Sequence, residues 1–351
     1  MPKINLIPKE NGFSMPAEWH HQRAMWLSFP KNVDTWEDRL ARVYPAYFKF
    51  IKAVSGGQQV CINVDDAETK RFIEDELYKY DIQESKIEIY LHKTNDAWCR
   101  DHGPAVLLNH KTKKRLVIDW GYNAWGGKYP PFDADDEIPI KIANQLGLDF
   151  VVPNIIMEGG SVEFNGAGTI LTSKSCLLNP NRNPHLNQQQ IEEILYNYYG
   201  AEQVLWVNEG IKGDDTDGHI DDTIRFVNES TVLACKSNNK LDENYNILRD
   251  NIKLLEKMRL PNEQKLDIVQ LPLPKPVFDS GERLPASYAN FYIANDVVVV
   301  PTYRSKNENE ALDIIQSCFK TRKVIGIDST EIIWGLGSFH CLSQQEPDFL
   351  V

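Results

Sequence analysis

Four polar clusters in this sequence hold the residues whose types could do chemistry. They lie at residues 95–104, 157–161, 213–222 and 334–347. Together they supply carboxylates, a histidine and a cysteine, which are groups used for nucleophilic and acid–base catalysis. Each cluster adjoins a segment with a strand-like pattern, where α/β folds commonly assemble their sites from loops.

The last cluster contains the candidate nucleophile, Cys341. Gly335 and Gly337 precede it in a loop, so the backbone can present the thiol to a cleft. An isolated cysteine is more often a small buried hydrophobe than a nucleophile. Its role therefore depends on what the other clusters supply.

The cluster at residues 213–222 combines five acids with His219. This invites a metal site, because carboxylates and imidazole are common ligands. The spacing is not that of a calcium-binding helix–loop–helix, and no second histidine stands nearby for zinc. If Ile220 points away in an extended segment, His219 and Asp221 share one face, which suits an acid/base histidine beside a carboxylate that binds a cation. A metal-dependent hydrolase centred on residues 214–222 stays an alternative.

The two remaining clusters contribute further carboxylates. In residues 95–104, Asp96 is the candidate for substrate contact, whereas Arg100 and Asp101 are expected to pair with each other and hold the loop. Glu158 is followed by two glycines, which suit a tight backbone that brings the carboxylate close to a ligand.

The composition limits the classes of partner. The 351 residues include 50 acidic and 38 basic side chains, a formal net charge of −12. This argues against nucleic acid, whose phosphates call for clustered Lys and Arg, and would tolerate a cationic small molecule.

The N-terminus lacks the features of a secretory signal, and no apolar run approaches the length of a membrane span. The six cysteines are scattered, without a Cys-x-x-Cys pair. We therefore expect a cytoplasmic protein without nucleic-acid or membrane partners. A homodimer is the commonest oligomeric state of such enzymes, and we expect it here.

The elements that must position these clusters alternate between strand and helix. Hairpins are predicted at residues 105–108 with 115–120, 162–164 with 169–172, and 224–227 with 232–234. Helices are predicted at 36–51, 68–80, 188–199, 243–257 and 309–320, and further strands at 60–64, 87–91, 203–207, 266–271, 297–300 and 323–327. A repeated hairpin, helix and strand fits either a doubly wound sheet or a radial arrangement of small α/β units, and periodicity does not choose between them.

Taken together and in this order, the clusters resemble those of the agmatine deiminases and related bacterial peptidylarginine deiminases, in the guanidino-group modifying superfamily. The resemblance runs from residues 15–19 to residues 344–347, with further matching segments at 119–127, 178–184 and 286–295. Four positions in two segments depart from the agmatine branch. Residues 335–341 read Gly-Leu-Gly-Ser-Phe-His-Cys where members usually carry Gly-Gly-Gly-Asn-Ile-His-Cys, and Asp217 stands where many relatives have Asn.

The resemblance implies an α/β fold, a five-bladed α/β propeller of the pentein type built from pseudo-fivefold ββαβ units, in a single catalytic domain over residues 1–351. It also implies roles for the candidate residues. Cys341 matches the nucleophile, His219 the general acid/base and Glu158 the carboxylate that supports the histidine and the substrate. Asp96 and Asp221 match the carboxylates that bind the guanidinium. We also assign Trp98, Trp120 and Asp215 to substrate binding.

These residue types suit guanidine hydrolysis. Carboxylates can grip a planar guanidinium through paired, charge-assisted hydrogen bonds, and a thiolate can attack the exposed carbon. We expect Cys341 to form a covalent thiouronium intermediate while His219 protonates the departing ammonia, and water then to release a ureido product. No metal or organic cofactor has a task in this scheme.

The sequence leaves the substrate open among cationic guanidines. Agmatine is the natural choice for a cytosolic metabolite, and it would yield N-carbamoylputrescine and ammonia. Free arginine would need a partner for its α-carboxylate, and peptidylarginine would require the same chemistry on a larger substrate. Besides the deiminase and the metal-dependent hydrolase, a non-catalytic protein that binds polyamines stays a third possible function.

Overall fold

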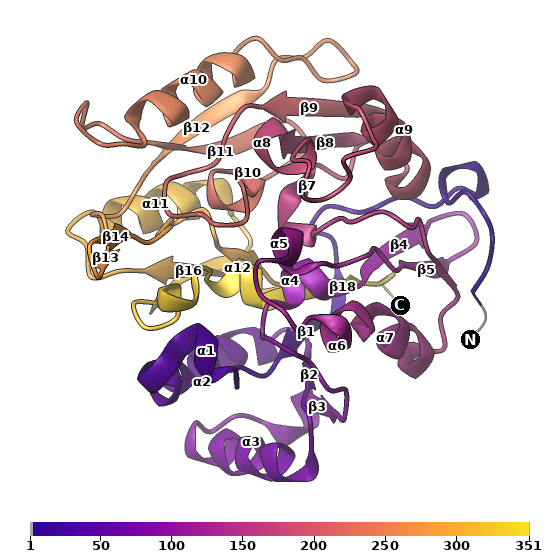
Figure 1. The fold of residues 1–351 in the computed structure, drawn as a ribbon, viewed down its shortest axis with the longest axis vertical. Helices are drawn as coiled ribbons and strands as arrows, with labels where there is room; N and C mark the ends of the chain where they lie inside the picture. The colour runs from indigo at the N-terminus through magenta and orange to yellow at the C-terminus, as the bar shows by residue number, and fades with distance from the viewer. Residues whose placement is uncertain (1–2, 351) are drawn as a thin grey trace.

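The computed structural model describes residues 3–350, so residues 1, 2 and 351 of the predicted domain lie outside the described part. Five sheets repeat one arrangement along the chain (Figure 1). In each sheet an antiparallel pair of strands is followed by a parallel neighbour. A parallel neighbour needs a crossover connection, and a helix supplies it each time.

The strands of the five sheets are as follows in their hydrogen-bonded order. They are β18 (Ser343–Pro347), β1 (Gln22–Ser28), β2 (Gln59–Asn63) and β3 (Ile87–Tyr90); β4 (Ala105–Asn109), β5 (Lys114–Ile118) and β6 (Phe150–Val151); β7 (Val162–Phe164), β8 (Thr169–Ser173) and β9 (Gln203–Val207); β10 (Ile224–Phe226), β11 (Thr231–Lys236) and β12 (Asp267–Pro272); and β15 (Tyr292–Ile293), β16 (Val297–Thr302) and β17 (Lys323–Asp328). A separate two-stranded ribbon consists of β13 (Phe278–Asp279) and β14 (Glu282–Arg283).

The longer helices connect or flank these strands. They are α2 (Leu40–Ser55), α3 (Ala67–Lys79), α7 (Ile138–Leu146), α9 (Gln188–Tyr199), α10 (Tyr245–Leu255) and α11 (Glu308–Cys318). Six short α-helical turns carry much of the loop structure: α1 (Val33–Trp36), α4 (Cys99–His102), α5 (Ala124–Gly127), α6 (Asp133–Asp136), α8 (Lys174–Leu177) and α12 (Phe339–Leu342). Within residues 3–350, no helix combines the length and the apolar character needed to cross a membrane.

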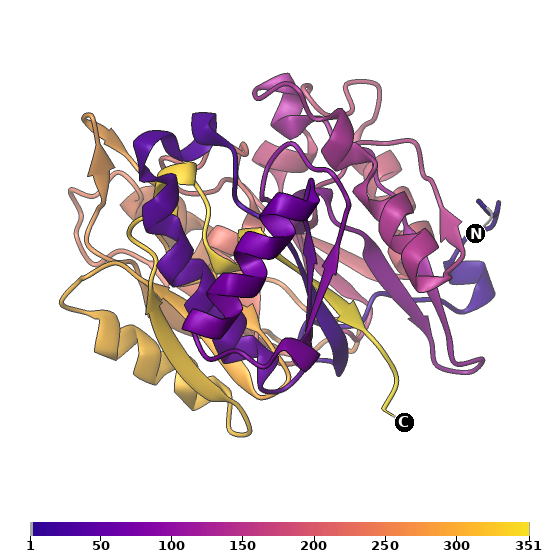
Figure 2. The same ribbon diagram turned by 90° about the horizontal axis from the view of Figure 1, so that it is seen from below.

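One of the five sheets joins the two ends of the chain. Strand β18 pairs antiparallel with β1, so that Met25 lies opposite Gln345. In Figure 2 the C-terminal strand, in yellow, runs back among the N-terminal segments. This pairing brings the loop that carries Cys341 into the middle of the molecule, next to α4.

The three predicted hairpins are confirmed, and the predicted longer helices and strands are each found within a few residues of their expected bounds. The helix predicted at residues 36–51 is divided into α1, a 3-10 turn and α2. Strand β18 was not predicted, because its sequence Ser-Gln-Gln-Glu-Pro has no apolar alternation. All five of its residues are nevertheless buried, and Glu346 accepts hydrogen bonds from Arg23 and Trp26.

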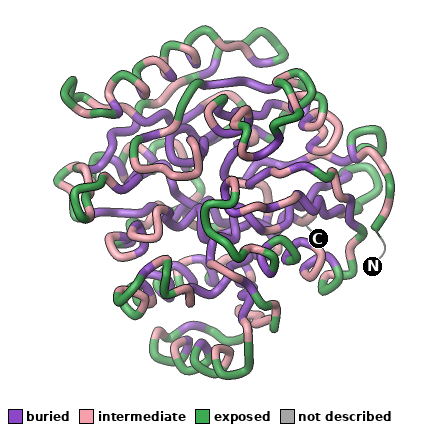
Figure 3. Tube along the Cα trace, in the orientation of Figure 1, coloured by how far each residue is buried: buried purple, intermediate pink, exposed green. Residues whose placement is uncertain are grey.

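The polar clusters converge where these units meet. The turn α4 contacts α12 and the 3-10 turn Gly159–Ser161, which in turn contacts the 3-10 turn Ile220–Asp222. Figure 3 shows that this central region is largely buried, whereas α3 and α10 present exposed faces at the periphery. The four clusters predicted to carry chemistry therefore meet in one place.

Candidate active site

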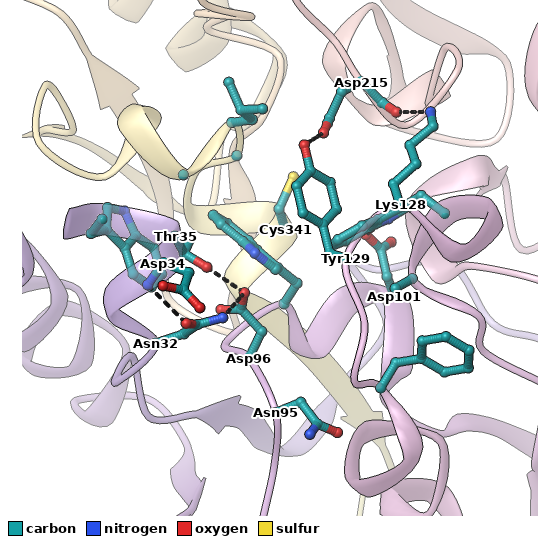
Figure 4. A pocket seen from close by; sticks show the side chains of 18 of the residues that line it. Asn32, Asp34, Thr35, Asn95, Asp96, Asp101, Lys128, Tyr129, Asp215 and Cys341 are labelled. Atoms are coloured by element: carbon teal, nitrogen blue, oxygen red, sulfur yellow. Dashed lines mark hydrogen bonds between the residues drawn. The ribbon is translucent and has the colours of Figure 1, made fainter.

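Cys341 lies at a cavity of about 930 Å³ (Figure 4). The cavity wall also includes three of the predicted substrate-binding residues, Asp96, Trp98 and Asp215. Acids predominate among its charged residues: Asp34, Glu37, Asp96, Asp101, Asp135, Asp215, Asp279 and Glu282, against Lys31, Lys93 and Lys128. The lining is thus suited to a cation.

The thiol of Cys341 is nearly buried, with 7% of the residue exposed. The turn α12 begins just after Gly337, and a Cβ at Gly337 would come within 2.5 Å of the Trp98 ring and 2.9 Å of the Cys341 Cβ. Gly337 is therefore required for the close approach that presents the cysteine, as its position in the sequence predicts. Asn290 Nδ2 donates to Cys341 Sγ at 2.9 Å.

Asp221 lies behind Cys341, with Oδ2 at 3.8 Å from Sγ. Oδ2 also accepts a hydrogen bond of 2.6 Å from Nδ1 of His340, while Oδ1 is buried without a hydrogen-bond partner among the described residues. A buried carboxylate oxygen without a donor is costly and calls for an explanation. A bound guanidinium N–H group is the kind of donor that would satisfy it.

Glu158 shows the same pattern. Its Oε1 accepts from Arg182 Nε at 2.8 Å, whereas Oε2 is buried without a hydrogen bond and lies 4.0 Å from Nε2 of His219. His219 Nε2 is also buried and has no hydrogen-bond partner among the described residues. Three of the five predicted catalytic residues thus carry an unpaired buried polar atom.

His219 faces a second carboxylate on its other nitrogen, since Nδ1 lies 3.7 Å from Asp101 Oδ1. A Cβ on Gly160 would come within 2.6 Å of His219 Nδ1, 2.9 Å of Asp101 Oδ1 and 3.2 Å of Asp221 Oδ2. These three side chains therefore converge on one backbone position that only glycine fits. Burial opposes the charged imidazole, but the carboxylate of Asp101 and the neighbouring Cys176 raise the pKa of His219 well above its usual value.

The surrounding acids act on the thiol in the opposite sense. Burial, followed by the charges of Asp221 and Asp222, raises the pKa of Cys341 well above that of a free thiol. Without a ligand, the thiol form is therefore favoured.

Asp96 also lines the cavity, next to Asn32 and Thr35 (Figure 4). Its Oδ2 accepts from Thr35 Oγ1 at 2.5 Å and from Asn32 Nδ2 at 3.1 Å, and its Oδ1 accepts from the Ala97 backbone at 2.7 Å. Burial raises the pKa of Asp96, although these hydrogen bonds oppose that shift. The carboxylate is thus held in place at the cavity wall.

Of two further residues predicted to bind substrate, Asp215 lies at the cavity and Trp120 does not. Asp215 lies at the cavity, where Oδ2 accepts from Tyr129 Oη at 2.5 Å and its backbone carbonyl accepts from Lys128. Trp120 does not line the cavity. It is packed in a hydrophobic cluster against Tyr198 and Tyr199, so the structure does not bring it together with the other predicted substrate-binding residues.

The structure contradicts the predicted pairing of Arg100 with Asp101. Arg100 turns away and donates to Glu18 at 3.3 Å and Gln344 at 2.6 Å. Asp101 instead lines the cavity and accepts from Trp125 Nε1 and Gly160 N, both at 3.0 Å. Adjacent residues on a helical turn point in different directions, so proximity in sequence does not make them partners.

The acids of residues 214–222 do not form one ligand shell. Asp214 accepts from the His219 backbone and Asp217 pairs with Arg182 and Lys128, while Asp222 accepts from Asn290. Within residues 3–350, the two groups whose ligand atoms lie close enough to share an ion are Glu158, Cys176 and His219, and Asp221, Asp222 and Cys341. Both overlap the candidate catalytic residues.

Comparison with known proteins decides the family. The sequence profile of the Porphyromonas-type peptidyl-arginine deiminases matches residues 14–347. The chain belongs to this family. A Legionella pneumophila (strain Paris) relative named "Putative agmatine deiminase" is 36% identical over 346 residues, which cover 98% of each chain. As a member, the chain is an enzyme that acts on a guanidino C–N bond.

Solved structures of the family have the same fold. The agmatine deiminase of Enterococcus faecalis aligns with a TM-score of 0.92 at 32% identity, covering 99% of this chain and 100% of its own. A serine-for-cysteine variant of C. jejuni agmatine deiminase with substrate bound aligns with a TM-score of 0.87 at 32% identity, over 97% of both chains. The α/β fold is thus shared along nearly the whole length.

Two of the four departures from the family's agmatine branch share one backbone feature. Leu336, which replaces a glycine, has φ +68°, and Asp217, which replaces an asparagine, has φ +69°. Glycine and asparagine adopt this left-handed region more readily than leucine does. Both positions thus keep the backbone conformation that the usual family residues favour.

The deiminase site includes residues that the sequence did not assign to catalysis or substrate binding: Asp101, Arg182, Asn290 and His340. Arg182 and Asn290 lie in segments that match the family, at residues 178–184 and 286–295, and His340 precedes the nucleophile. These matches to the family were the feature of the sequence that could have pointed to Arg182, Asn290 and His340 as site residues. Their roles depend on partners that only the folded chain brings together.

Proposed function

We propose that this protein is a cysteine-dependent deiminase that hydrolyses agmatine to N-carbamoylputrescine and ammonia. One observation carries the proposal: the Cys341 thiol lies at an acidic cavity, with the unpaired Asp221 carboxylate oxygen and His219 immediately behind the wall. This combination offers a nucleophile, a proton donor and acceptors for a planar cation. The named agmatine deiminases to which the chain is similar support the choice of reaction.

The first step of the proposed mechanism is attack by the Cys341 thiolate, whose proton leaves to solvent when the substrate binds, on the guanidinium carbon. A C–S bond forms, His219 transfers its proton to the departing nitrogen, and the C–N bond breaks to release ammonia. His219 is suited to this task because the charge of Asp101 keeps its proton bound. The product of this step is a thiouronium attached to Cys341.

In the second step water attacks the thiouronium carbon while His219, now neutral, accepts a proton. The C–S bond breaks, Cys341 is regenerated and the ureido product leaves. Asp96 and Asp221 bind guanidinium N–H groups through both steps, and Glu158 supports His219 from the Nε2 side.

Thiol ionisation is coupled to substrate binding in this proposal. The acids around Cys341 raise its pKa in the free enzyme, and a bound guanidinium supplies the positive charge that reverses this effect. A titration of the thiol with and without a cationic guanidine inhibitor tests the coupling. An unchanged thiol pKa on binding would refute it.

The charges at the cavity favour agmatine over arginine. A free α-carboxylate would need a cation, but Lys31 pairs with Asp65 and Lys128 pairs with Asp217 at 2.9 Å, which leaves Lys93 as the one remaining lysine among the described cavity residues, against eight acids. No arginine is among the residues that line the cavity. The terminal ammonium of agmatine is instead compatible with the acidic wall, where Asp215 is a candidate contact.

The proposal extends to the molecule as a whole. The five repeated sheets support a five-bladed propeller of pentein type that forms one catalytic domain. A cytoplasmic location and a homodimer remain predictions of the sequence.

The direct experiment incubates the protein with agmatine, free arginine or an arginine-containing peptide and measures ureido product and ammonia. Cys341→Ala serves as the inactive variant and Cys318→Ala, whose cysteine lies outside the cavity, as the matched control. Turnover of agmatine alone, lost in Cys341→Ala, supports the proposal, whereas turnover only of arginine or the peptide would move the substrate. Activity that is abolished by a chelator and survives loss of Cys341 would favour the metal-dependent alternative. Saturable polyamine binding without ammonia release would indicate a binding protein.

A further inference from the structure

His340, the residue before the nucleophile, is buried between two carboxylates. Its Nδ1 lies 2.6 Å from Asp221 Oδ2, and its Nε2 lies 2.7 Å from Glu18 Oε2. Burial opposes ionisation, but the positive charges around Glu18 and Asp221 keep the pKa of each carboxyl below its usual value. An ionised carboxylate can only accept hydrogen bonds, so both ring nitrogens donate. The ring is then an imidazolium that links Glu18 to Asp221.

The two carboxylates depend on His340 to different degrees. Glu18 has other donors: Arg225 Nη2 at 3.1 Å, Arg100 Nη2 at 3.3 Å and the Ile293 backbone at 2.6 Å. For Asp221, the other donors to Oδ2 are the Asn290 amide at 3.4 Å and the Cys341 thiol at 3.8 Å, both long. His340 is therefore the principal fixed donor to Asp221 but one of several to Glu18.

The bond from His340 also determines which oxygen of Asp221 is free. Because Oδ2 is bound to the ring, the unpaired Oδ1 is the one left to accept from a ligand. Rotation of the carboxylate would break the 2.6 Å contact and leave a buried charge without its partner, which is costly.

We propose that His340 is a positioning residue that acts through Asp221: it holds the Asp221 carboxylate so that Oδ1 receives the guanidinium beside Cys341. This rests on the deiminase function proposed above. The charges that face the ring are Glu18 and Asp221, and the Arg100 guanidinium lies against the His340 backbone carbonyl at 3.3 Å. The positive ring also helps Asp221 stay ionised: burial opposes ionisation, but the hydrogen bond and charge of His340 keep the pKa of Asp221 below its usual value.

Two nearly isosteric substitutions separate the two contacts of the ring. The amide nitrogen of asparagine can take the place of Nδ1, so His340→Asn keeps a donor toward Asp221 and loses the one toward Glu18. The amide nitrogen of glutamine can take the place of Nε2, so His340→Gln keeps a donor toward Glu18 and loses the one toward Asp221. At metal sites, loss of the hydrogen-bond partner that orients a ligating side chain lowers activity by about 10- to 100-fold, and we expect an effect of that order where His340 orients Asp221.

The test measures agmatine turnover, as kcat and KM, and thermal unfolding for the wild-type protein and both variants. We expect kcat/KM of His340→Gln to be at least about 10-fold below that of His340→Asn, regardless of which variant unfolds at the lower temperature. A purely structural role predicts equal kcat/KM in the folded fractions, or the lower value for His340→Asn, and either result would overturn the proposal. Absence of turnover in the wild-type protein would count against the proposed function instead.

A second measurement needs no substitution at His340. In ¹⁵N-histidine NMR spectra of the wild-type protein at pH 7, we expect both nitrogens of one buried ring to carry protons, with strongly hydrogen-bonded, low-field N–H signals that are kept in a His219→Asn variant. A neutral ring at this position would overturn the proposal even if the variants at His340 failed to fold.

Discussion

The side-chain amide of Asn290 contacts Cys341 twice. Its Nδ2 donates to Sγ at 2.9 Å, and its Oδ1 accepts from the Cys341 backbone N–H at 3.3 Å. Oδ1 also accepts from the His340 backbone N–H at 3.1 Å, so two donors fix the orientation of the amide and direct its NH₂ group at the sulfur. A donor at this position stabilises the thiolate relative to the thiol.

Asn290→Asp should therefore slow the enzyme. It replaces the donor to Cys341 with a carboxylate beside Asp221 and Asp222, which raises the thiol pKa further. We expect kcat/KM for agmatine and the rate of thiol alkylation at pH 7 each to fall by about 10-fold or more. Asn262→Asp, at an exposed position, is the matched control and should leave both rates unchanged. Unaltered alkylation in Asn290→Asp would contradict the assigned hydrogen bond.

Asp101→Asn should shift the pH dependence of catalysis. The protonated form of His219 is the proton donor, and Asp101 raises the pKa of His219. Removal of this charge lowers that pKa, so the alkaline decline of kcat should move to lower pH by about one unit. The measurement is the pH profile of kcat, and Asp34→Asn, an exposed acid at the same cavity, should keep the wild-type profile. A shift to higher pH, or none, would show that Asp101 does not act on the proton donor.

Gly160→Ala should disable the site while the protein stays folded. The added Cβ would lie 2.6 Å from His219 Nδ1 and 2.9 Å from Asp101 Oδ1, so both side chains must move. Misplacement of catalytic groups by about 1 Å can cost roughly 100-fold, and we expect at least that loss in kcat/KM. Gly56→Ala is the control, because nothing lies within 4 Å of its Cβ and its φ of −62° suits alanine. Full activity in Gly160→Ala would mean that His219 and Asp101 need not be held where the structure places them.

Asp119→Asn should stabilise the protein at alkaline pH. Burial, with the nearby charge of Asp136, raises the pKa of Asp119 to about 7. Because the folded pKa lies above the unfolded value of about 4, stability is lost as pH rises through this interval, and the loss is complete above pH 7. Relative to wild type, the variant should gain on the order of 2 kcal/mol in the free energy of unfolding at pH 8 and little at pH 4. Denaturant unfolding at both pH values checks this, with the exposed Asp149→Asn as control. An equal effect at the two pH values would exclude titration of Asp119 as the cause.

Much of the local structure could be predicted from the sequence. Helix α9 and strand β9 have the predicted bounds, Gln188–Tyr199 and Gln203–Val207, because their apolar residues recur with the period of a helix or fill a buried strand. Strand β18 could not be found in this way, because it buries polar side chains that are satisfied by Arg23 and Arg115 from other strands.

Part of the candidate site could likewise be predicted from the sequence, and part could not. The residue types and their order were sufficient to suggest Cys341, His219, Glu158, Asp96 and Asp221 and to indicate the family. The sequence could not distinguish Trp120, which packs in a hydrophobic cluster, from Trp98, which lines the cavity, because both are aromatic residues near polar loops.

The sequence by itself determined the family, the reactive groups and most of the repeated elements, because each of these depends on residue types and short-range periodicity. Only the tertiary structure decided which buried atoms are paired and which are left for a ligand. His340 and Glu18 are 322 positions apart, yet their 2.7 Å contact helps fix the one Asp221 oxygen that remains free. Hydrogen bonds act over about 3 Å in space and do not depend on distance along the chain, so the fold alone decides those partners.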